Sequence, residues 1–137
     1  MDKRAILTKL NYMRMDLEKL VEEDPATWED KKVQSRVGWL VEKIEDIEHD
    51  IKYYSKKSKQ GKIYKQSDGR FAIDEDNYFT CGYPLEMFVY DSFECEKVWC
   101  EGRIEGRFEN RESIYYFLNK DGDNKDLEEG DLVRIRE

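Results

Sequence analysis

The chain has 137 residues, with 24 Lys and Arg against 32 Asp and Glu, and its formal net charge is −8 at pH 7. Aromatic residues make up 13% of the chain, which argues against disorder because each ring can bury a large apolar area. No apolar run approaches the roughly 20 residues that a membrane-spanning helix needs, and residues 1–4 do not begin a signal peptide. The composition therefore predicts a soluble, cytoplasmic protein with no membrane partner.

The character of the chain changes near residue 60. Residues 1–60 carry 13 basic and 13 acidic side chains, whereas residues 61–137 carry 11 basic and 19 acidic ones. Glycine and proline are scarce in the first segment and frequent in the second, which is typical of strands joined by turns. We therefore expect an α+β chain with a helical hairpin over residues 1–57, a linker at 58–61 and a small β domain over 62–137.

Apolar residues recur at alternating spacings of four and three in the helical segment. The two series are Ile6, Leu10, Met13, Leu17, Leu20 and, after a break, Val33, Val37, Leu40, Ile44, Ile47, Ile51, Tyr54. This spacing places one apolar seam along each helix, as in coiled coils. Asp24 is predicted to cap the second helix with Pro25 at its first position, and the short connection predicts an antiparallel hairpin.

The two seams hold more apolar surface than two helices can cover on each other. The second helix, at about 31 residues, outruns the first, at about 21. A third body must cover the remainder, and it is either the β domain or a second copy of the chain. We favour the second copy and predict a dimer that associates through Leu10, Met13, Leu17, Val37, Leu40, Ile44, Ile47 and Ile51.

Short alternating runs separated by turn residues indicate the strands of the β domain. Residues 62–66 and 70–74 form a predicted hairpin, and residues 85–90, 113–118 and 132–136 form further strands. Over residues 98–109 the interior side of the pattern holds Val98, Cys100, Gly102, Ile104, Gly106 and Phe108. Glycines on that side favour bends. The pattern predicts a small antiparallel barrel resembling an SH3 domain.

The outward side chains of the β domain form a candidate partner surface, composed of Trp99, Arg103, Arg107, Tyr115, Arg134 and Arg136. A barrel that binds single-stranded nucleic acid would use such arginines together with aromatic rings. However, Glu101, Glu105 and Glu109 alternate with two of these arginines, and the excess of acidic residues would repel a polyanion. We therefore expect a protein partner. Single-stranded nucleic-acid binding and mimicry of nucleic acid by the acidic surface are the alternatives.

Groups suited to catalysis or metal binding are scarce. His49 is the only histidine and falls on the outward side of the second helix, and no nucleophile has a base nearby in the sequence. Cys81, Cys95 and Cys100 are expected to be reduced thiols, because their loose spacing fits zinc poorly. The loop at 121–129 lacks the glycine of a calcium loop, and Leu132 stands where that loop needs glutamate. We expect a non-enzyme that binds no cofactor and no metal.

Several short motifs of the β domain resemble those of a known protein family. They lie at residues 69–73, 79–86, 99–105, 115–117 and 130–136, and consist mainly of spaced aromatic and glycine residues. Over residues 62–137 the chain resembles an uncharacterised family of small bacterial β domains that occurs in Gram-positive genomes and on mobile elements. Because that family has no assigned activity, the resemblance implies a fold and a genomic setting but no mechanism. The helical hairpin lies outside it.

Overall fold

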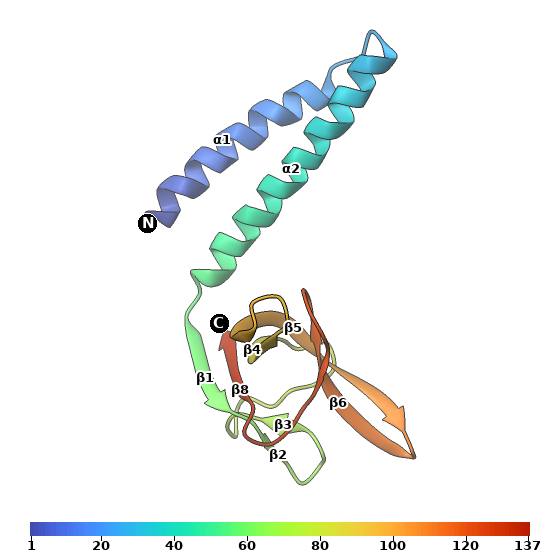
Figure 1. The fold of residues 1–137 in the computed structure, drawn as a ribbon. Helices are drawn as coiled ribbons and strands as arrows, with labels where there is room; N and C mark the ends of the chain where they lie inside the picture. Colours follow the sequence, from blue (N-terminus) through green and yellow to red (C-terminus); the bar gives the residue numbers. More distant parts are fainter. The chain divides into compact units, whose positions relative to one another are not determined.

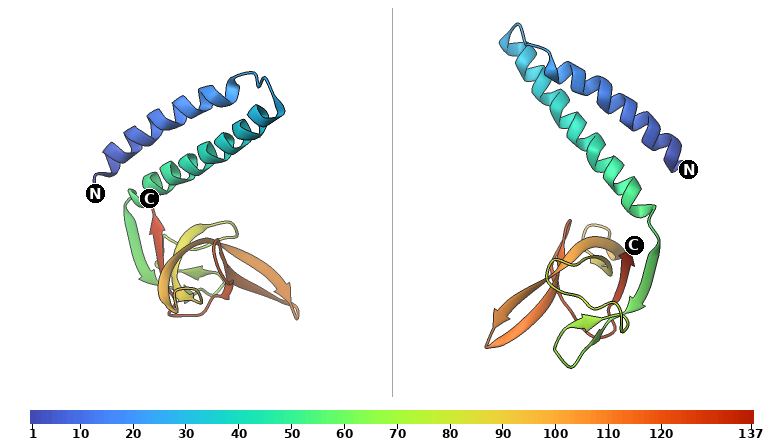
Figure 2. Two further views of the ribbon diagram at one scale, coloured as in Figure 1. Left: turned by 45° about the horizontal axis from the view of Figure 1, so that its top comes forward. Right: turned by 180° about the vertical axis from the view of Figure 1, so that it is seen from behind.

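The computed structural model describes residues 1–137 and divides them into two compact units, Met1–Lys56 and Lys57–Glu137. The first unit consists of helices α1 (Lys3–Glu22) and α2 (Trp28–Tyr54), and the second holds eight strands (Figures 1 and 2). The chain is therefore α+β, as the sequence predicts. Neither helix contains a stretch long and apolar enough to cross a membrane.

Helix α2 begins three residues later than the sequence predicts. The side chain of Thr27 accepts a hydrogen bond of 3.1 Å from the backbone N–H of Asp30, and the helix starts at Trp28. Asp30 also places a negative charge in the first turn, next to the positive end of the helix dipole. The prediction that Asp24 caps this helix with Pro25 at its first position is wrong, because Thr27 supplies the cap.

Two polar contacts tie the helices together as an antiparallel hairpin (Figure 1). The side-chain amide of Gln34 on α2 donates hydrogen bonds to the carbonyl oxygens of Leu20, at 3.1 Å, and Glu23, at 2.6 Å. Such carbonyls at a helix C-terminus have no partner within their own helix. Further along, Nε of Arg14 on α1 donates a 2.8 Å hydrogen bond to the carboxylate of Glu48 on α2. The predicted antiparallel hairpin is confirmed.

The second unit contains an antiparallel six-stranded sheet in the order β1-β8-β4-β5-β6-β7. Its strands are β1 (Ser58–Lys62), β4 (Pro84–Asp91), β5 (Glu96–Glu109), β6 (Glu112–Asn119), β7 (Lys125–Asp126) and β8 (Leu132–Arg136). The short strands β2 (Tyr64–Lys65) and β3 (Phe71–Ala72) form the predicted hairpin. Since β1 and β7 end the sheet without pairing, no closed barrel is found, and the SH3-like barrel is not confirmed. Residues 58–61, assigned to a linker by the sequence, belong to β1 and pair with β8.

Strand β5 is shared between two neighbours. It pairs with β4 through residues 96–103 and with β6 through residues 102–109. At Gly102, where the two pairings meet, an added Cβ would lie 2.3 Å from the carbonyl oxygen of Leu118 and 2.5 Å from a ring carbon of Phe117. Only glycine leaves room for this close approach.

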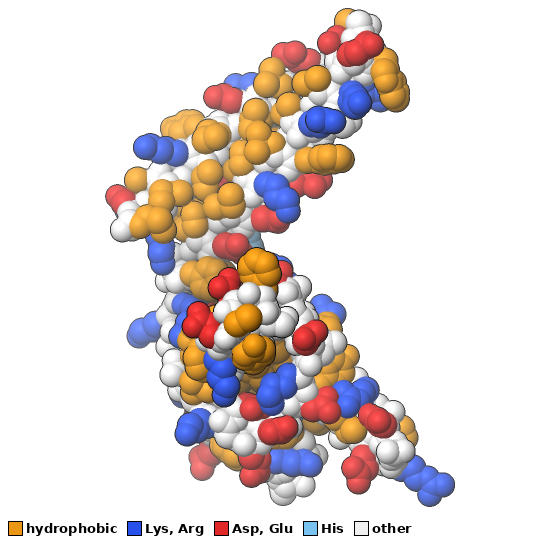
Figure 3. All heavy atoms as spheres, in the orientation of Figure 1, with side chains coloured by type: hydrophobic (Ala, Val, Ile, Leu, Met, Phe, Trp, Pro, Cys, Tyr) orange, Lys and Arg blue, Asp and Glu red, His pale blue; other side chains and the backbone are white.

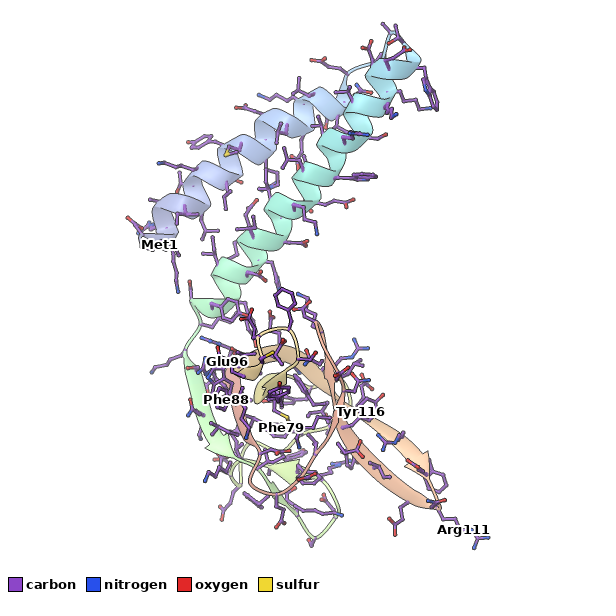
Figure 4. All side chains as sticks on the ribbon, viewed as in Figure 1. Met1, Phe79, Phe88, Glu96, Arg111 and Tyr116 are labelled. Carbon is purple, nitrogen blue, oxygen red and sulfur yellow. The ribbon has the colours of Figure 1, made fainter.

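The core lies on one side of the bent sheet. Its members come from β4, β5, β6 and β8 and from the segments between strands, and they include Phe79, Leu85, Met87, Val89, Cys100, Ile104, Phe117, Val133 and Ile135. The predicted alternation in β4 and β8 is confirmed. Phe108 is an exception, because it is 75% exposed although the pattern places it on the interior side. The β5–β6 hairpin runs past the core toward its tip at Arg111 (Figure 4), so this end of the strand has nothing to pack against.

Candidate interaction surfaces

About half of the residues of the predicted seams lie on the inner side of the helical hairpin. On α1, Leu10 and Leu17 are half-buried. On α2, Ile44 is buried, and Val37 and Ile51 are half-buried. These five predicted seam residues therefore lie between the two helices of one chain rather than on a free surface. Helix α1 contains no buried residue at all.

The other half of the predicted seams remains exposed. Leu40 is 49% exposed, Ile47 46% and Met13 51%, and Leu20 and Val33 are exposed as well. These five residues are called the apolar face below. Within each helix they are spaced by seven residues, which is close to two full turns and keeps them in line along the helix.

The two lines of the apolar face lie on the same side of the hairpin. On α1 the exposed Met13 lies three residues after the half-buried Leu10, and on α2 the exposed Ile47 lies three residues after the buried Ile44. In both helices, a step of three residues rotates the side-chain direction by the same angle and in the same sense about the helix axis. Because the helices are antiparallel, equal turns carry both lines toward the same side. Figure 3 shows hydrophobic side chains gathered along both helices of the hairpin.

A polar cluster occupies part of the inner side. Arg14 contacts the carboxylate of Glu48 at 2.8 Å, that of Glu18 at 3.1 Å and the side-chain oxygen of Asn11 at 2.8 Å. The hydrogen bonds that Arg14 donates to Glu48 and Glu18 raise the pKa of Arg14 above its ordinary value. Sequence reasoning missed this cluster. The sequence does hold a signal for it. Arg14 and Glu48 each follow an apolar residue at the border of the seams, Leu7 and Val41, by seven positions and so lie on the same side of their helices.

Three residues of the predicted partner surface come together on the outer side of strands β8, β4 and β5. The guanidinium of Arg134 lies 4.0 Å from the centre of the Trp99 ring, and Phe88 packs on the same ring at a centroid distance of 5.3 Å. Arg136 donates hydrogen bonds to both oxygens of Glu86, at 2.8 Å and 3.3 Å. The carboxylate of Glu86, which is 2% exposed, also lies 3.6 Å from Arg134. Both arginines form ion pairs with Glu86, and Arg134 also contacts the Trp99 ring.

The remaining predicted partner residues lie elsewhere in the β domain. Arg103 forms an ion pair with Glu105 at 2.7 Å. Tyr115 packs against the core, so its assignment to the outer surface does not hold, and its neighbour Tyr116 lies on the outer side instead, below the guanidinium of Arg107 at 5.5 Å. Figure 4 shows Tyr116 on β6. Arg107 is separate from the Trp99 group.

Arg107 is engaged by two carboxylates. Its guanidinium donates two hydrogen bonds to the carboxylate of Asp126, at 2.6 Å and 2.9 Å, and one of 3.0 Å to Glu109. The hydrogen bonds that Arg107 donates to Asp126 and Glu109 raise the pKa of Arg107, and those to Asp126 lower the pKa of that carboxyl group. This arginine therefore serves the link between β5 and β7.

Exposed aromatic rings lie at the turns of the β4–β5 and β5–β6 hairpins. Phe93, in the turn between β4 and β5, is 91% exposed, and Tyr90 beside it is exposed as well. Phe108 lies near the tip of the β5–β6 hairpin, where Asn110 and Arg111 both have positive φ angles, as a two-residue type I′ turn requires. The strand patterns of the sequence predict no role for Phe93, because an aromatic residue in a turn belongs to neither strand.

The thiols and acidic groups do not converge on a metal site. Cys100 is buried, whereas Cys81 and Cys95 are exposed, and all three are free. No group of three or more His, Cys, Asp and Glu side chains is arranged to hold a metal ion. His49 is exposed on α2.

The chain belongs to the family defined by a domain of unknown function, DUF5348, whose family model matches residues 61–135. The match spans the β domain and leaves the helical hairpin outside, in agreement with the resemblance noted from the sequence. No curated protein and no solved structure matches the chain.

Proposed function

We propose that this DUF5348 protein is a non-catalytic adaptor that self-associates through the apolar face of its helical hairpin and presents its β domain to a protein partner. The observation that carries the proposal is that α1 buries none of its 20 residues although its apolar residues follow a regular helical spacing. An amphipathic helix gains most of its stability by packing that side against another element.

The apolar face suits burial against a second copy. Met13, Leu20, Val33, Leu40 and Ile47 form an elongated strip along one side of the hairpin. Burying apolar surface contributes about 25 cal/mol per Å², so covering this strip favours association. Two such hairpins placed with these faces together make a four-helix bundle, a common way of completing helical pairs.

The electrostatics of the β domain favour a protein partner over nucleic acid. Residues 61–137 carry 19 acidic and 11 basic side chains, and their long-range field repels phosphates. Arg103, Arg107 and Arg134 are engaged by carboxylates of the same chain. The exposed rings of Phe93 and Phe108 offer apolar anchors of the kind that protein interfaces use.

Sedimentation equilibrium of the full chain across the micromolar range tests the self-association. We expect a dimer, and we expect Leu40→Glu with Ile47→Glu to give a monomer with unchanged helical circular dichroism, since both side chains are exposed within one hairpin. Met15→Glu is the matched control, because Met15 is an exposed apolar residue that lies two residues from Met13 and therefore on the opposite side of α1. A wild-type chain that stays monomeric throughout would overturn the proposal.

A further inference from the structure

We propose that the second copy packs with its helix connection at the same end as that of the first, so that α1 of each copy lies along α2 of the other. The two-fold axis then runs parallel to the helices. This inference rests on the proposed self-association and specifies its geometry. The alternative dimer has the two connections at opposite ends and brings α1 against α1 and α2 against α2.

The contacts inside the hairpin establish which residues of the two helices lie at the same level. Arg14 meets Glu48, and Gln34 meets the backbone of Glu23. Because both helices rise by the same amount per residue, residues between and beside these contacts can be matched. Asp16 lies within about one turn of the level of Lys43, and Lys9 within about one turn of the level of Asp50.

The same four charged residues border the apolar face on its outer edges. On α1, Lys9 follows Ile6 by three positions, and Asp16 follows Met13 by three. On α2, Lys43 follows Leu40 and Asp50 follows Ile47 by the same interval. The identical step places all four on the side of the apolar lines that points away from the other helix of the same hairpin. Lys9, Asp16 and Lys43 are exposed, and Asp50 is half-buried.

A two-fold axis parallel to the helices preserves the level of every residue. It sets the outer edge of α1 beside the outer edge of α2 of the other copy. Asp16 of one copy then faces Lys43 of the other, and Lys9 faces Asp50. Each pair has opposite charges and occurs twice. The long lysine side chains can bridge an offset of about one helical turn, and charges that flank an apolar seam select partner and orientation in helical assemblies.

The opposite-end dimer, when centred on the apolar face, places like charges opposite each other. When its axis crosses the middle of the apolar face, near the level of Asp16 and Lys43, Asp16 meets Asp16 and Lys43 meets Lys43. Like charges across an interface disfavour that arrangement. A shifted register can bring Asp16 against Lys9 and Lys43 against Asp50, but the shift leaves part of the apolar face, including Val33, without a partner. Charge and apolar overlap together favour the same-end dimer.

Charge reversal in the full chain tests the geometry. Asp16→Lys alone and Lys43→Asp alone each turn two attractive pairs into repulsive ones, so each should raise the dissociation constant of the dimer about tenfold at low salt. The double variant in one chain exchanges the charges and should return it to within about twofold of the wild type. Glu42→Lys is the matched control, because Glu42 lies two residues from Leu40 and therefore on the opposite side of α2.

The outcomes separate this inference from the proposed function. A wild-type chain that stays monomeric overturns both the inference and the proposed function. A wild-type dimer that neither single variant weakens indicates the centred opposite-end dimer and overturns the inference alone. A double variant weaker than either single variant indicates the shifted opposite-end dimer, in which both exchanged residues meet like charges, and overturns it as well. Restored affinity in the double variant, lost again when only one residue is reversed, supports the same-end dimer.

Discussion

Arg14 and Glu48 form the closest ion pair between the two helices, with 2.8 Å between Nε and the carboxylate oxygen. The side chain of Glu48 is only 10% exposed and that of Arg14 24%. The pair lies on the inner side of the hairpin, in line with the apolar residues Leu7 and Val41, seven positions earlier on each helix. A polar contact at such a place fixes the register of two helices that apolar packing alone would hold loosely.

This relationship predicts an asymmetric response to substitution. Arg14→Met leaves the carboxylate of Glu48 without its cation in a poorly hydrated place, whereas Glu48→Leu leaves Arg14 with its contacts to Glu18 and Asn11. We expect Arg14→Met to lower the urea midpoint of the hairpin more than Glu48→Leu does. The double variant Arg14→Met with Glu48→Leu should recover most of the loss, because two apolar side chains replace the pair. Helical circular dichroism against urea measures all three.

Additive losses in that double variant would contradict the prediction. They would mean that the two side chains contribute independently, so that the unpaired carboxylate is not what makes Arg14→Met costly.

The sequence predicted the seams but not which part of each seam is covered. A spacing of alternating threes and fours describes two neighbouring lines on a helix, and it is the same whether one or both are buried. In the structure Ile44 is buried, whereas Leu40 and Ile47 are exposed. The polar contacts of Arg14 and Gln34 determine which side of α2 faces α1. Apolar periodicity cannot detect those contacts, because polar residues interrupt the pattern that it measures.

The β domain shows a similar limit. Alternation over residues 98–109 placed Cys100 and Ile104 correctly in the core, and it put Gly102 on the same interior side, where an added Cβ would meet Phe117. It placed Phe108 inside as well, because a pattern of period two reports on which side of a strand a residue lies. How far the core extends along the strand depends on its neighbours. The predicted barrel closure is not found for the same reason, since closure depends on whether β1 meets β7.

Gly102→Ala should destabilise the β domain. The added methyl group would lie 2.3 Å from the carbonyl oxygen of Leu118 and 2.5 Å from the ring of Phe117, so the β5–β6 pairing must shift. We expect a loss of about 2 kcal/mol in the free energy of unfolding, as for other overpacked sites. Thermal unfolding followed through the aromatic circular dichroism measures it.

Gly38→Ala is the matched control for this substitution. Gly38 lies within α2, and an added Cβ there meets nothing within 4 Å. Alanine should stabilise the helix by about 0.5–1 kcal/mol, because it favours helical backbone more than glycine does. Equal effects of the two glycine substitutions would show that close packing at Gly102 is not what sets the outcome.

The contacts of Asp74 predict that the β domain loses stability in acid. Its carboxylate contacts Nζ of Lys59 on β1 at 2.5 Å and accepts hydrogen bonds from the side-chain amide of Asn77 and the backbone N–H of Asp76. Lys59 and then Asn77 lower the pKa of Asp74 from 3.8 to about 2. Because the folded state favours the charged form, this contribution is complete above pH 3.8 and disappears as the pH falls toward 2.

Urea unfolding at a series of pH values from 5 to about 2 measures that contribution. In Asp74→Asn the stability should fall less steeply over this interval than in the wild type. Glu75→Gln is the matched control, because it removes the same charge from the neighbouring exposed residue. Identical pH profiles for wild type and Asp74→Asn would contradict the assignment.

Arg136 and Arg134 should differ in what they contribute to the β domain, although both lie on β8 and both approach Glu86. Arg136 donates two hydrogen bonds to this buried carboxylate, whereas Arg134 lies 3.6 Å from it and rests mainly on the Trp99 ring. Arg136→Met leaves a buried charge with a distant cation and should cost about 3 kcal/mol. Arg134→Met loses the contact with the ring and should cost about 1 kcal/mol.

Chemical unfolding and tryptophan fluorescence separate the two roles. Arg136→Met should lower the unfolding midpoint strongly with little change in native-state emission, and adding Glu86→Leu should restore much of the midpoint, since no buried charge then remains. Arg134→Met should alter the emission contributed by Trp99, because it removes the cation 4.0 Å from the ring. If Arg134→Met were the more destabilising of the two, the ring contact rather than the forked ion pair would be the main support of this side of the sheet.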